Sequence, residues 1–170
     1  VVLYGPPTSR EGIRSVASFT VDGVRLAYDV TGDEGPAVVA LHGLTSSRKR
    51  EELMRLDVAS RVPGVRLLRY DARGHGRSTG RSRPDDYQWP RLASDLLALL
   101  DEVFPDEPVH GVGPSMGTAT LLYAALAQPE RFASLTLMLP PTAWASRRAR
   151  AADYEAAASL VETEGLAAFI

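Results

Sequence analysis

A serine between two glycines is the feature of this sequence most suited to chemistry. Ser115 stands in the stretch Gly-Pro-Ser-Met-Gly, with Gly113 and Gly117 each two residues away. A sharp turn from a strand into a helix brings its neighbours into close approach, so it requires small residues at these two positions. The turn leaves the serine oxygen exposed, and the N-terminus of the following helix favours developing negative charge. The spacing therefore indicates a nucleophilic serine suited to acyl transfer.

The segments on either side of Ser115 are those that such a turn needs. A strand is predicted over residues 108–112 and a helix over 116–128, which Pro129 prevents from continuing. An ordinary loop in which the serine only caps the helix is the first alternative. A dinucleotide site is the second, but Met116 stands where the third glycine of G-x-G-x-x-G belongs, and no G-x-x-x-x-G-K-S/T phosphate loop occurs.

A second glycine-containing loop follows the first buried strand. Its sequence is Leu-His-Gly-Leu, and Gly43 allows the backbone to bend back toward the edge of the sheet. The backbone N–H groups of Leu44 and Met116 would then bracket an oxyanion formed at Ser115. His42 lies beside this loop, and we expect it to support the loop rather than to act as a base.

A third loop, Asp-Ala-Arg-Gly-His-Gly-Arg-Ser at residues 71–78, follows the next predicted strand. We expect Asp71 and Arg73 to pair and lock this loop, while its glycines permit tight turns. His75 is interpreted as a structural residue and not as a base. Several arginines nearby suggest an anion site, but aspartates lie beside them, so local ion pairs are the simpler interpretation. These arginines are Arg69, Arg73, Arg77, Arg81 and Arg83.

The predicted elements place these three loops at the C-terminal edge of a sheet. Asp22-Gly23 lies inside an alternating stretch at residues 18–30, which predicts a β-hairpin. Apolar strands then alternate with helices, which indicates an α/β fold with a mostly parallel sheet. The expected strands after the hairpin cover residues 37–41, 65–70, 108–112 and 134–139, and the expected helices cover 46–62, 89–104 and 116–128.

Composition argues against several classes of protein. The 170 residues, 45% of them hydrophobic, suffice for one globular domain with a sizeable core. A net charge of −2 is not typical of a nucleic-acid-binding protein, and no apolar run approaches the roughly 20 residues of a membrane span. The absence of cysteine removes disulfides and cysteine-based zinc sites and is compatible with a cytoplasmic location. No metal or cofactor is predicted, and the sequence leaves the oligomeric state open.

Together, the three loops resemble those of the α/β-hydrolase family, in the order and spacing of the first part of its core. The residues that carry the resemblance are His42-Gly43, the loop at 71–78 and the Gly-Pro-Ser-Met-Gly stretch. One departure is Pro114, which stands where histidine is common in relatives. Proline stiffens the turn and removes a backbone donor from it.

The resemblance implies a serine hydrolase with Ser115 as the nucleophile and the backbone N–H groups of Leu44 and Met116 as the oxyanion hole. It implies small esters or lactones as substrates, because the C-terminal segment is loosely similar to those of esterases and enol-lactone hydrolases. A serine at this position argues against haloalkane dehalogenases and epoxide hydrolases, relatives that use an aspartate there. The residues expected to support the site are His42, Gly43, Gly113 and Gly117.

Three regions are expected along the chain. Residues 1–17 are predicted to form a flexible arm, residues 18–141 the N-terminal part of the hydrolase core, and residues 142–170 the start of a helical cap. The cap segment carries a cluster of arginines that we interpret as a solvated helix face. These are Arg147, Arg148 and Arg150.

The sequence lacks the acid–base half of a catalytic triad. In the family the acid and then the histidine follow the nucleophile, whereas all three histidines precede Ser115. The chain has no initiating Met and stops inside a helical pattern, so we expect the missing strands, acid and histidine in a C-terminal part beyond residue 170. The alternative is a non-catalytic ligand-binding or interaction protein. The three histidines are His42, His75 and His110.

Overall fold

The computed structural model describes residues 16–141 and 144–168. Contacts divide the chain into two units, Val1–Leu139 and Pro140–Ile170. Most of the arm expected at residues 1–17 lies outside the described residues. The arm was expected to end at residue 17, but Ala17 already belongs to a strand.

The first unit contains one sheet of six strands in the order β1-β2-β4-β3-β5-β6. The first two strands form the expected hairpin, and β2 runs antiparallel to β4. The pairs β3–β4, β3–β5 and β5–β6 are parallel, which confirms an α/β fold with a mixed, largely parallel sheet. The strands are β1 (Ala17–Val21), β2 (Val24–Thr31), β3 (Ala37–Ala40), β4 (Arg66–Tyr70), β5 (Val109–Pro114) and β6 (Phe132–Met138).

The hairpin turn has the backbone that its sequence predicts. Asp22 and Gly23 have φ angles of 50° and 72°, the pair of positive values that a two-residue turn of this type requires. Val24 and Leu26 then point into the core and are fully buried. The turn therefore starts β2 in the register that buries Val24 and Leu26 on the same face of the sheet.

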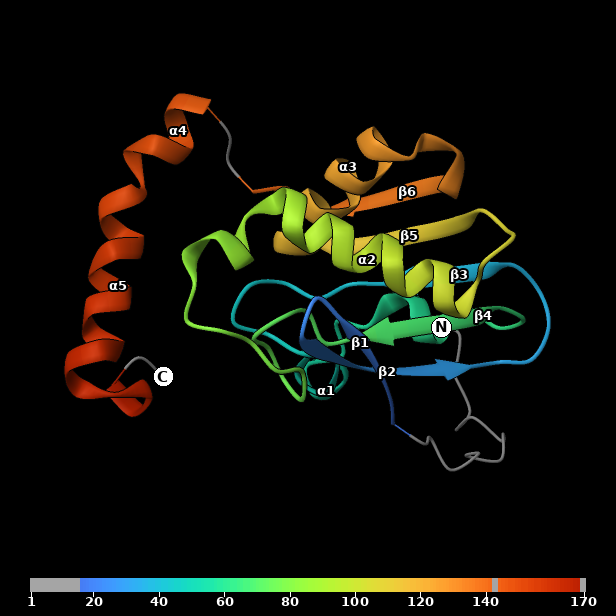
Figure 1. Cartoon of the computed structure of the whole chain (residues 1–170), viewed down its shortest axis with the longest axis horizontal. Helices are drawn as coiled ribbons and strands as arrows, with labels where there is room; N and C mark the ends of the chain where they lie inside the picture. Colours follow the sequence, from blue (N-terminus) through green and yellow to red (C-terminus); the bar gives the residue numbers. More distant parts are fainter. Residues whose placement is uncertain (1–15, 142–143, 169–170) are drawn as a thin grey trace, which may run out of the picture. The chain divides into compact units, whose positions relative to one another are not determined.

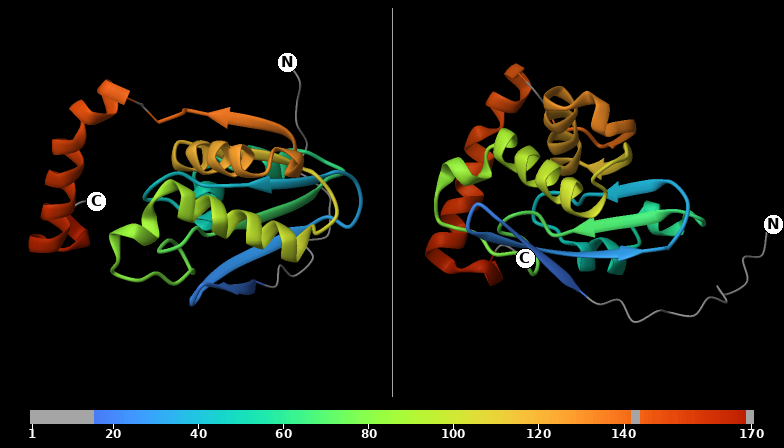
Figure 2. Two further views of the ribbon diagram at one scale, coloured as in Figure 1. Left: turned by 45° about the horizontal axis from the view of Figure 1, so that its top comes forward. Right: turned by 45° about the vertical axis from the view of Figure 1, so that its right-hand side comes forward.

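Helices cover both faces of this sheet (Figures 1 and 2). Helices α2 (Trp89–Val103) and α3 (Met116–Ala127) lie on one face, and α1 (Arg48–Leu53) lies on the other. The main core forms between the sheet and the pair α2 and α3. Its fully buried members include Val39, Leu68, Leu96, Leu99, Leu100, Val109 and Leu121.

The helix expected over residues 46–62 is wrong in extent. The α-helix begins after Ser47, whose side chain accepts a hydrogen bond from the Arg50 N–H, and it ends at Leu53. Arg55 then has a φ of 57°, which no α-helix continues through. The Asp57 side chain accepts from the Ser60 hydroxyl at 2.7 Å and holds a separate 3₁₀ turn, η1 (Val58–Arg61).

The remaining elements are 3₁₀ turns and the two helices of the second unit. Three further 3₁₀ turns are η2 (Pro84–Tyr87), η3 (Pro129–Arg131) and η4 (Leu166–Ala168). The second unit contains α4 (Trp144–Ala149) and α5 (Ala151–Glu164), so the helical character expected after the core is present there. Of the expected arginine cluster, Arg148 and Arg150 are exposed, and Arg150 pairs with Asp153 at 2.8 Å. The Arg147 side chain lies outside the described residues.

Candidate active site

Ser115 occupies a strained turn between a strand and a helix. Strand β5 ends at Pro114 and α3 begins at Met116, so Ser115 is the single residue between them. Its φ and ψ are 47° and −107°, values that a residue other than glycine rarely adopts. The Ser115 N–H donates to the Met138 carbonyl at 2.9 Å, which ties the turn to the end of β6.

The two flanking glycines have no room for a side chain. A Cβ on Gly113 would lie 2.9 Å from the carbonyl carbon of Gly117, and a Cβ on Gly117 would lie 2.8 Å from the Leu41 Cβ. Both distances are shorter than non-bonded carbon atoms tolerate. The close approach that the glycine spacing predicted is therefore present at Ser115.

The hydroxyl of Ser115 does not cap the helix that follows it. The side chain makes no capping hydrogen bond, so the alternative of a simple capping serine does not describe this turn. Thr118 is instead the hydroxyl residue that secures the turn, with its Oγ1 2.7 Å from the Gly113 carbonyl and 2.9 Å from the Met138 carbonyl. Sequence reasoning missed Thr118, because a threonine in the first turn of a helix carries no distinctive signal.

The loop at residues 43–46 lies directly against Ser115. A Cβ on Gly43 would lie 3.9 Å from the Ser115 Cβ, so the two backbones are neighbours. The Ser46 N–H donates to the Gly43 carbonyl at 3.2 Å and closes a tight turn across Leu44. Among the described residues, no acceptor takes up the backbone N–H of Leu44 or of Met116. Both groups expected to form an oxyanion hole are thus free to donate.

His42 connects two of the three loops through its ring. Its Nδ1 donates to the Gly43 carbonyl at 2.8 Å, and its Nε2 accepts from the Ala72 N–H at 2.9 Å. Burial lowers the pKa of His42 below its ordinary value, which favours the neutral ring that this pattern of donor and acceptor requires. Both nitrogens are occupied, so neither can take a proton from Ser115 in this arrangement.

The pair expected between Asp71 and Arg73 does not form. The Asp71 carboxylate accepts from the backbone N–H groups of Arg48 and Arg77 at 2.8 and 2.9 Å, and the Arg48 guanidinium lies 3.3 Å away. Burial alone would raise the pKa of Asp71, but these N–H groups and Arg48 hold it below its usual value. With its oxygens already occupied, Asp71 locks the loop through α1 instead.

Arg73 pairs with Asp95 and Asp86 and not with Asp71. Its side chain is fully buried and donates twice to the Asp95 carboxylate of α2, with both distances 2.8 Å. Asp86 lies 3.1 Å from the third nitrogen of the guanidinium. A carboxylate that accepts two parallel hydrogen bonds matches the geometry of a guanidinium, and here Asp95, 22 residues away in sequence, supplies it. Of the other arginines, Arg81 pairs with Asp86 locally, as expected. Arg69 does not pair locally: its guanidinium lies 2.9 Å from Asp29 of β2, 40 residues away in sequence.

The other two histidines are also engaged. His75 Nδ1 donates to the Arg73 carbonyl at 2.9 Å, and its ring lies 5.1 Å from that of His42. His110 lies on β5, with its Nδ1 2.7 Å from the Ser134 hydroxyl. Within the described part of the chain, no histidine or carboxylate is hydrogen-bonded to Ser115.

Glu51 is a residue of this site that the sequence did not indicate. It lies on α1 with only 8% of its surface exposed, and its Oε1 is 2.8 Å from the Ser46 hydroxyl and 3.5 Å from the Gly43 nitrogen. An acidic residue within an expected polar helix gives no signal of such a position.

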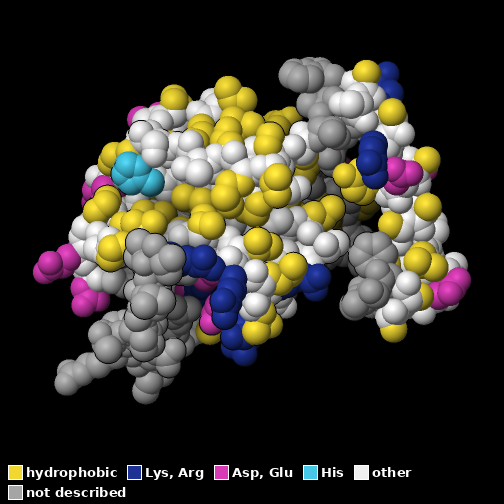
Figure 3. Space-filling view, turned by 180° about the vertical axis from the view of Figure 1, so that it is seen from behind, with side chains coloured by type: hydrophobic (Ala, Val, Ile, Leu, Met, Phe, Trp, Pro, Cys, Tyr) yellow, Lys and Arg dark blue, Asp and Glu magenta, His cyan; other side chains and the backbone are white. Residues whose placement is uncertain are grey.

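A hollow of about 320 Å³ opens beside this loop. It reaches Gly43 and Pro114, the residue before Ser115, and most of its wall is apolar. Figure 3 views the face of the sheet that carries α1, where hydrophobic side chains gather in a broad patch. The apolar side chains around the hollow are those of Leu44, Met54, Leu56, Val58, Met138 and Leu139.

The described residues contain neither a metal-binding cluster nor a membrane-spanning helix. No group of three histidine, aspartate or glutamate side chains in residues 16–141 and 144–168 is placed to hold a metal ion. In the same residues, none of the helices combines the length and apolar character that crossing a membrane demands.

Comparison with known proteins identifies relatives with several activities. Lipase LipV of Mycobacterium tuberculosis is 35% identical over 122 residues, which are 70% of this chain and 43% of that protein. The 3-oxoadipate enol-lactonase 1 of Acinetobacter baylyi is 30% identical over 126 residues, 74% of this chain and 45% of the relative. This chain therefore spans less than half the length of these relatives.

A solved structure and a family model also match this chain. Epoxide hydrolase A from Mycobacterium thermoresistibile superimposes with a TM-score of 0.63 at 29% identity, over 82% of this chain and 44% of the other. The model of the family described as alpha/beta hydrolase fold matches residues 36–161, which include all three loops of the site. The chain thus belongs to the alpha/beta hydrolase family, whose members named here are hydrolases.

Proposed function

We propose that this chain belongs to a serine hydrolase that cleaves small esters or lactones. It would supply the nucleophile, Ser115, and the loop at residues 43–46 that contributes to the oxyanion hole. The strained backbone of Ser115 is the observation that carries the proposal, because surrounding contacts hold it although the serine caps nothing. Two backbone N–H groups without an acceptor among the described residues, those of Leu44 and Met116, support it as well, because the loop that contains Leu44 lies against Ser115.

The reaction follows from this arrangement. The Ser115 oxygen attacks the carbonyl carbon of the ester while a base takes its proton, and the carbonyl oxygen becomes an oxyanion held by the two N–H groups. The tetrahedral intermediate collapses, the carbon–oxygen bond to the alcohol breaks, and the alcohol leaves with the proton. Water then releases the acid by the same steps. We assign the base and its acid to residues beyond the 170, because the three histidines here have other partners.

The hollow beside the loop at residues 43–46 supports a small substrate with an apolar part. About 320 Å³ is near the lower end for small-molecule sites, and the apolar wall favours an aliphatic part of the substrate. The relatives named as a lipase and an enol-lactonase both cleave bonds of the proposed type. The proposal includes a cytoplasmic location, small-molecule substrates and no cofactor, nucleic acid or membrane partner.

Replacing Ser115 in the complete protein tests the assignment. S115A should lower kcat/KM for p-nitrophenyl butyrate by at least about a thousandfold and abolish labelling by a fluorophosphonate. S94A is the matched control, since the Ser94 hydroxyl only donates to the Pro90 carbonyl within α2. Undiminished activity or labelling in S115A would exclude Ser115 as the nucleophile.

A second candidate is a non-catalytic ligand-binding or interaction protein. The lack of any acid or base bonded to Ser115 within the described residues is the observation that favours it. The same labelling experiment separates the two functions. A complete protein that binds small esters without turnover, and whose Ser115 remains unlabelled, would establish the second candidate.

A further inference from the structure

We propose that Glu51 is a positioning residue that holds the oxyanion loop (residues 43–46) in its donating conformation. The inference rests on the proposed function, because it assigns a role at the same site. Glu51 also lines the hollow beside the loop, but its Oε1 is taken by Ser46 and Gly43, so we assign it to the loop and not to the substrate. Its effect would appear in the rate of the chemical step and not in substrate affinity.

The carboxylate of Glu51 bonds to both ends of the oxyanion loop. Its Oε1 lies 2.8 Å from the Ser46 hydroxyl at one end and 3.5 Å from the Gly43 nitrogen at the other. The Ser46 N–H donates back to the Gly43 carbonyl at 3.2 Å. A single buried oxygen thus joins the two residues that bracket Leu44 and Thr45.

The direction of the Leu44 N–H depends on this closure. The Gly43 carbonyl and the Leu44 N–H belong to one planar peptide group and point to opposite sides of it. The carbonyl accepts from His42 Nδ1 at 2.8 Å and from the Ser46 N–H, which fixes the plane. Because Glu51 holds Ser46, it also holds the plane from which Leu44 donates.

The loop also contains backbone strain that its contacts must hold. Thr45 has a φ of 59°, a conformation costly for a β-branched residue, and the Leu44 side chain is 49% exposed. Glu51 itself is anchored, because its helix is tied to the sheet by Arg48, which pairs with Asp29 at 2.6 Å. The rigid helix and the strained loop therefore meet at one carboxylate.

Four variants of the complete protein test this role by kcat, KM and inhibition by butaneboronic acid, which mimics the tetrahedral oxyanion. E51A should lower kcat and boronate affinity together by about a hundredfold, with KM within about twofold. E51Q keeps an oxygen acceptor for Ser46 and should retain kcat within about fivefold. S46A removes one of the two contacts and should fall between E51A and the wild type.

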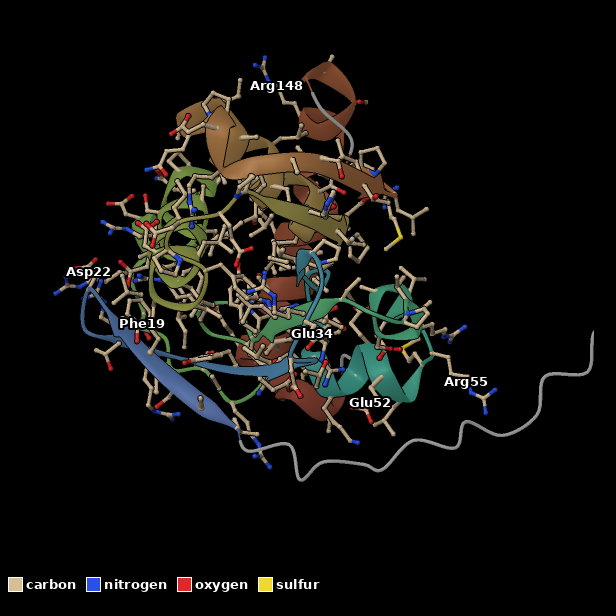
Figure 4. All side chains as sticks on the ribbon, turned by 90° about the vertical axis from the view of Figure 1, so that its right-hand side faces the viewer. Phe19, Asp22, Glu34, Glu52, Arg55 and Arg148 are labelled. Carbon is tan, nitrogen blue, oxygen red and sulfur yellow. The ribbon has the colours of Figure 1, made fainter. Side chains whose placement is uncertain are left out.

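E52A is the matched control for E51A. Glu52 is the next residue on the same short helix and is exposed, and Figure 4 shows it on α1. We expect wild-type kcat, KM and boronate affinity for E52A. Thermal unfolding of each variant separates a local effect from a loss of the fold.

Specific outcomes would overturn the role of Glu51. Wild-type kcat in E51A would do so, as would a change confined to KM or an equal loss in E51Q. If E51A does not fold, an unchanged kcat in S46A overturns it. Activity that is abolished in S115A but intact in E51A overturns only this inference, whereas activity that survives S115A overturns the proposed function as well.

Discussion

Ser115 adopts a conformation that costs a residue other than glycine about 1–3 kcal/mol. The Met138 carbonyl accepts from the Ser115 N–H and from the Thr118 hydroxyl, so the end of a neighbouring strand stabilises the turn. Gly113 and Gly117 allow the backbones to approach. A chain holds such strain only where the surroundings determine it, which supports a role for Ser115 beyond packing.

His42 predicts a pH dependence of stability at the residue scale. Its pKa is lower in the folded protein than its ordinary value of 6.5, so unfolding takes up a proton near and below that pH. The stabilisation that neutral His42 gives the folded protein is therefore complete above pH 6.5. It decreases as the pH falls toward the pKa that His42 has in the folded protein. Asp71, whose pKa is also lowered, loses its contribution only below its ordinary value of 3.8.

Thermal unfolding at about pH 7.5 and about pH 5.5 measures the His42 contribution. The wild-type Tm should fall between these values, and H42Q should show a smaller fall from a lower starting Tm. H75Q is the control, and we expect it to keep most of the wild-type slope. A wild-type Tm that is equal at both pH values would contradict the prediction.

At the scale of elements, helix α2 holds the loop at residues 71–78 through a buried ion pair. Arg73 is 0% exposed, and both oxygens of Asp95 accept from it. The pattern of leucines in α2 predicted the helix correctly. It could not show that one polar residue on the buried face, Asp95, meets an arginine from a distant loop.

Removing Asp95 should therefore destabilise the protein. D95A leaves a buried guanidinium with Asp86 as its remaining partner, and the free energy of unfolding should fall by about 3 kcal/mol. D101A is the control on the same helix, because the Asp101 side chain is 61% exposed and should contribute less than about 1 kcal/mol. Urea unfolding measures both variants, and equal stabilities would contradict a structural role for the pair.

At the scale of the whole molecule, β6 is an edge strand with apolar side chains exposed. Within the described residues it pairs only with β5. Leu137 of β6 is 38% exposed, and Leu139, the residue that follows the strand, is 80% exposed. Exposed edge strands of this kind pair readily with other chains. We therefore expect the 170-residue chain, when produced by itself, to self-associate.

Size-exclusion chromatography with light scattering tests this expectation. L137K places a charge on the edge strand and should shift the chain toward the monomer. L53K is the control, because Leu53 is 72% exposed but lies on α1 and not on β6. A wild-type chain that is monomeric at all concentrations, or a monomer produced equally by L53K, would contradict the role of β6.

The sequence alone determined the order of the elements, the parallel sheet with its N-terminal hairpin, and the serine turn. These features depend on local rules: apolar periodicity, the Asp-Gly turn and glycine spacing each act within a few residues. The same rules failed at residues 46–62, where the helix ends at Leu53, Arg55 has a positive φ, and Asp57 holds a separate 3₁₀ turn.

Only the tertiary structure decided which charged and polar residues meet. It paired Asp71 with Arg48 and Arg73 with Asp95, occupied both nitrogens of His42, and brought Glu51 to the oxyanion loop. The reason is physical: a buried polar group must find a partner, and its partner can come from any segment that the fold brings near. Spacing along the chain does not contain that information.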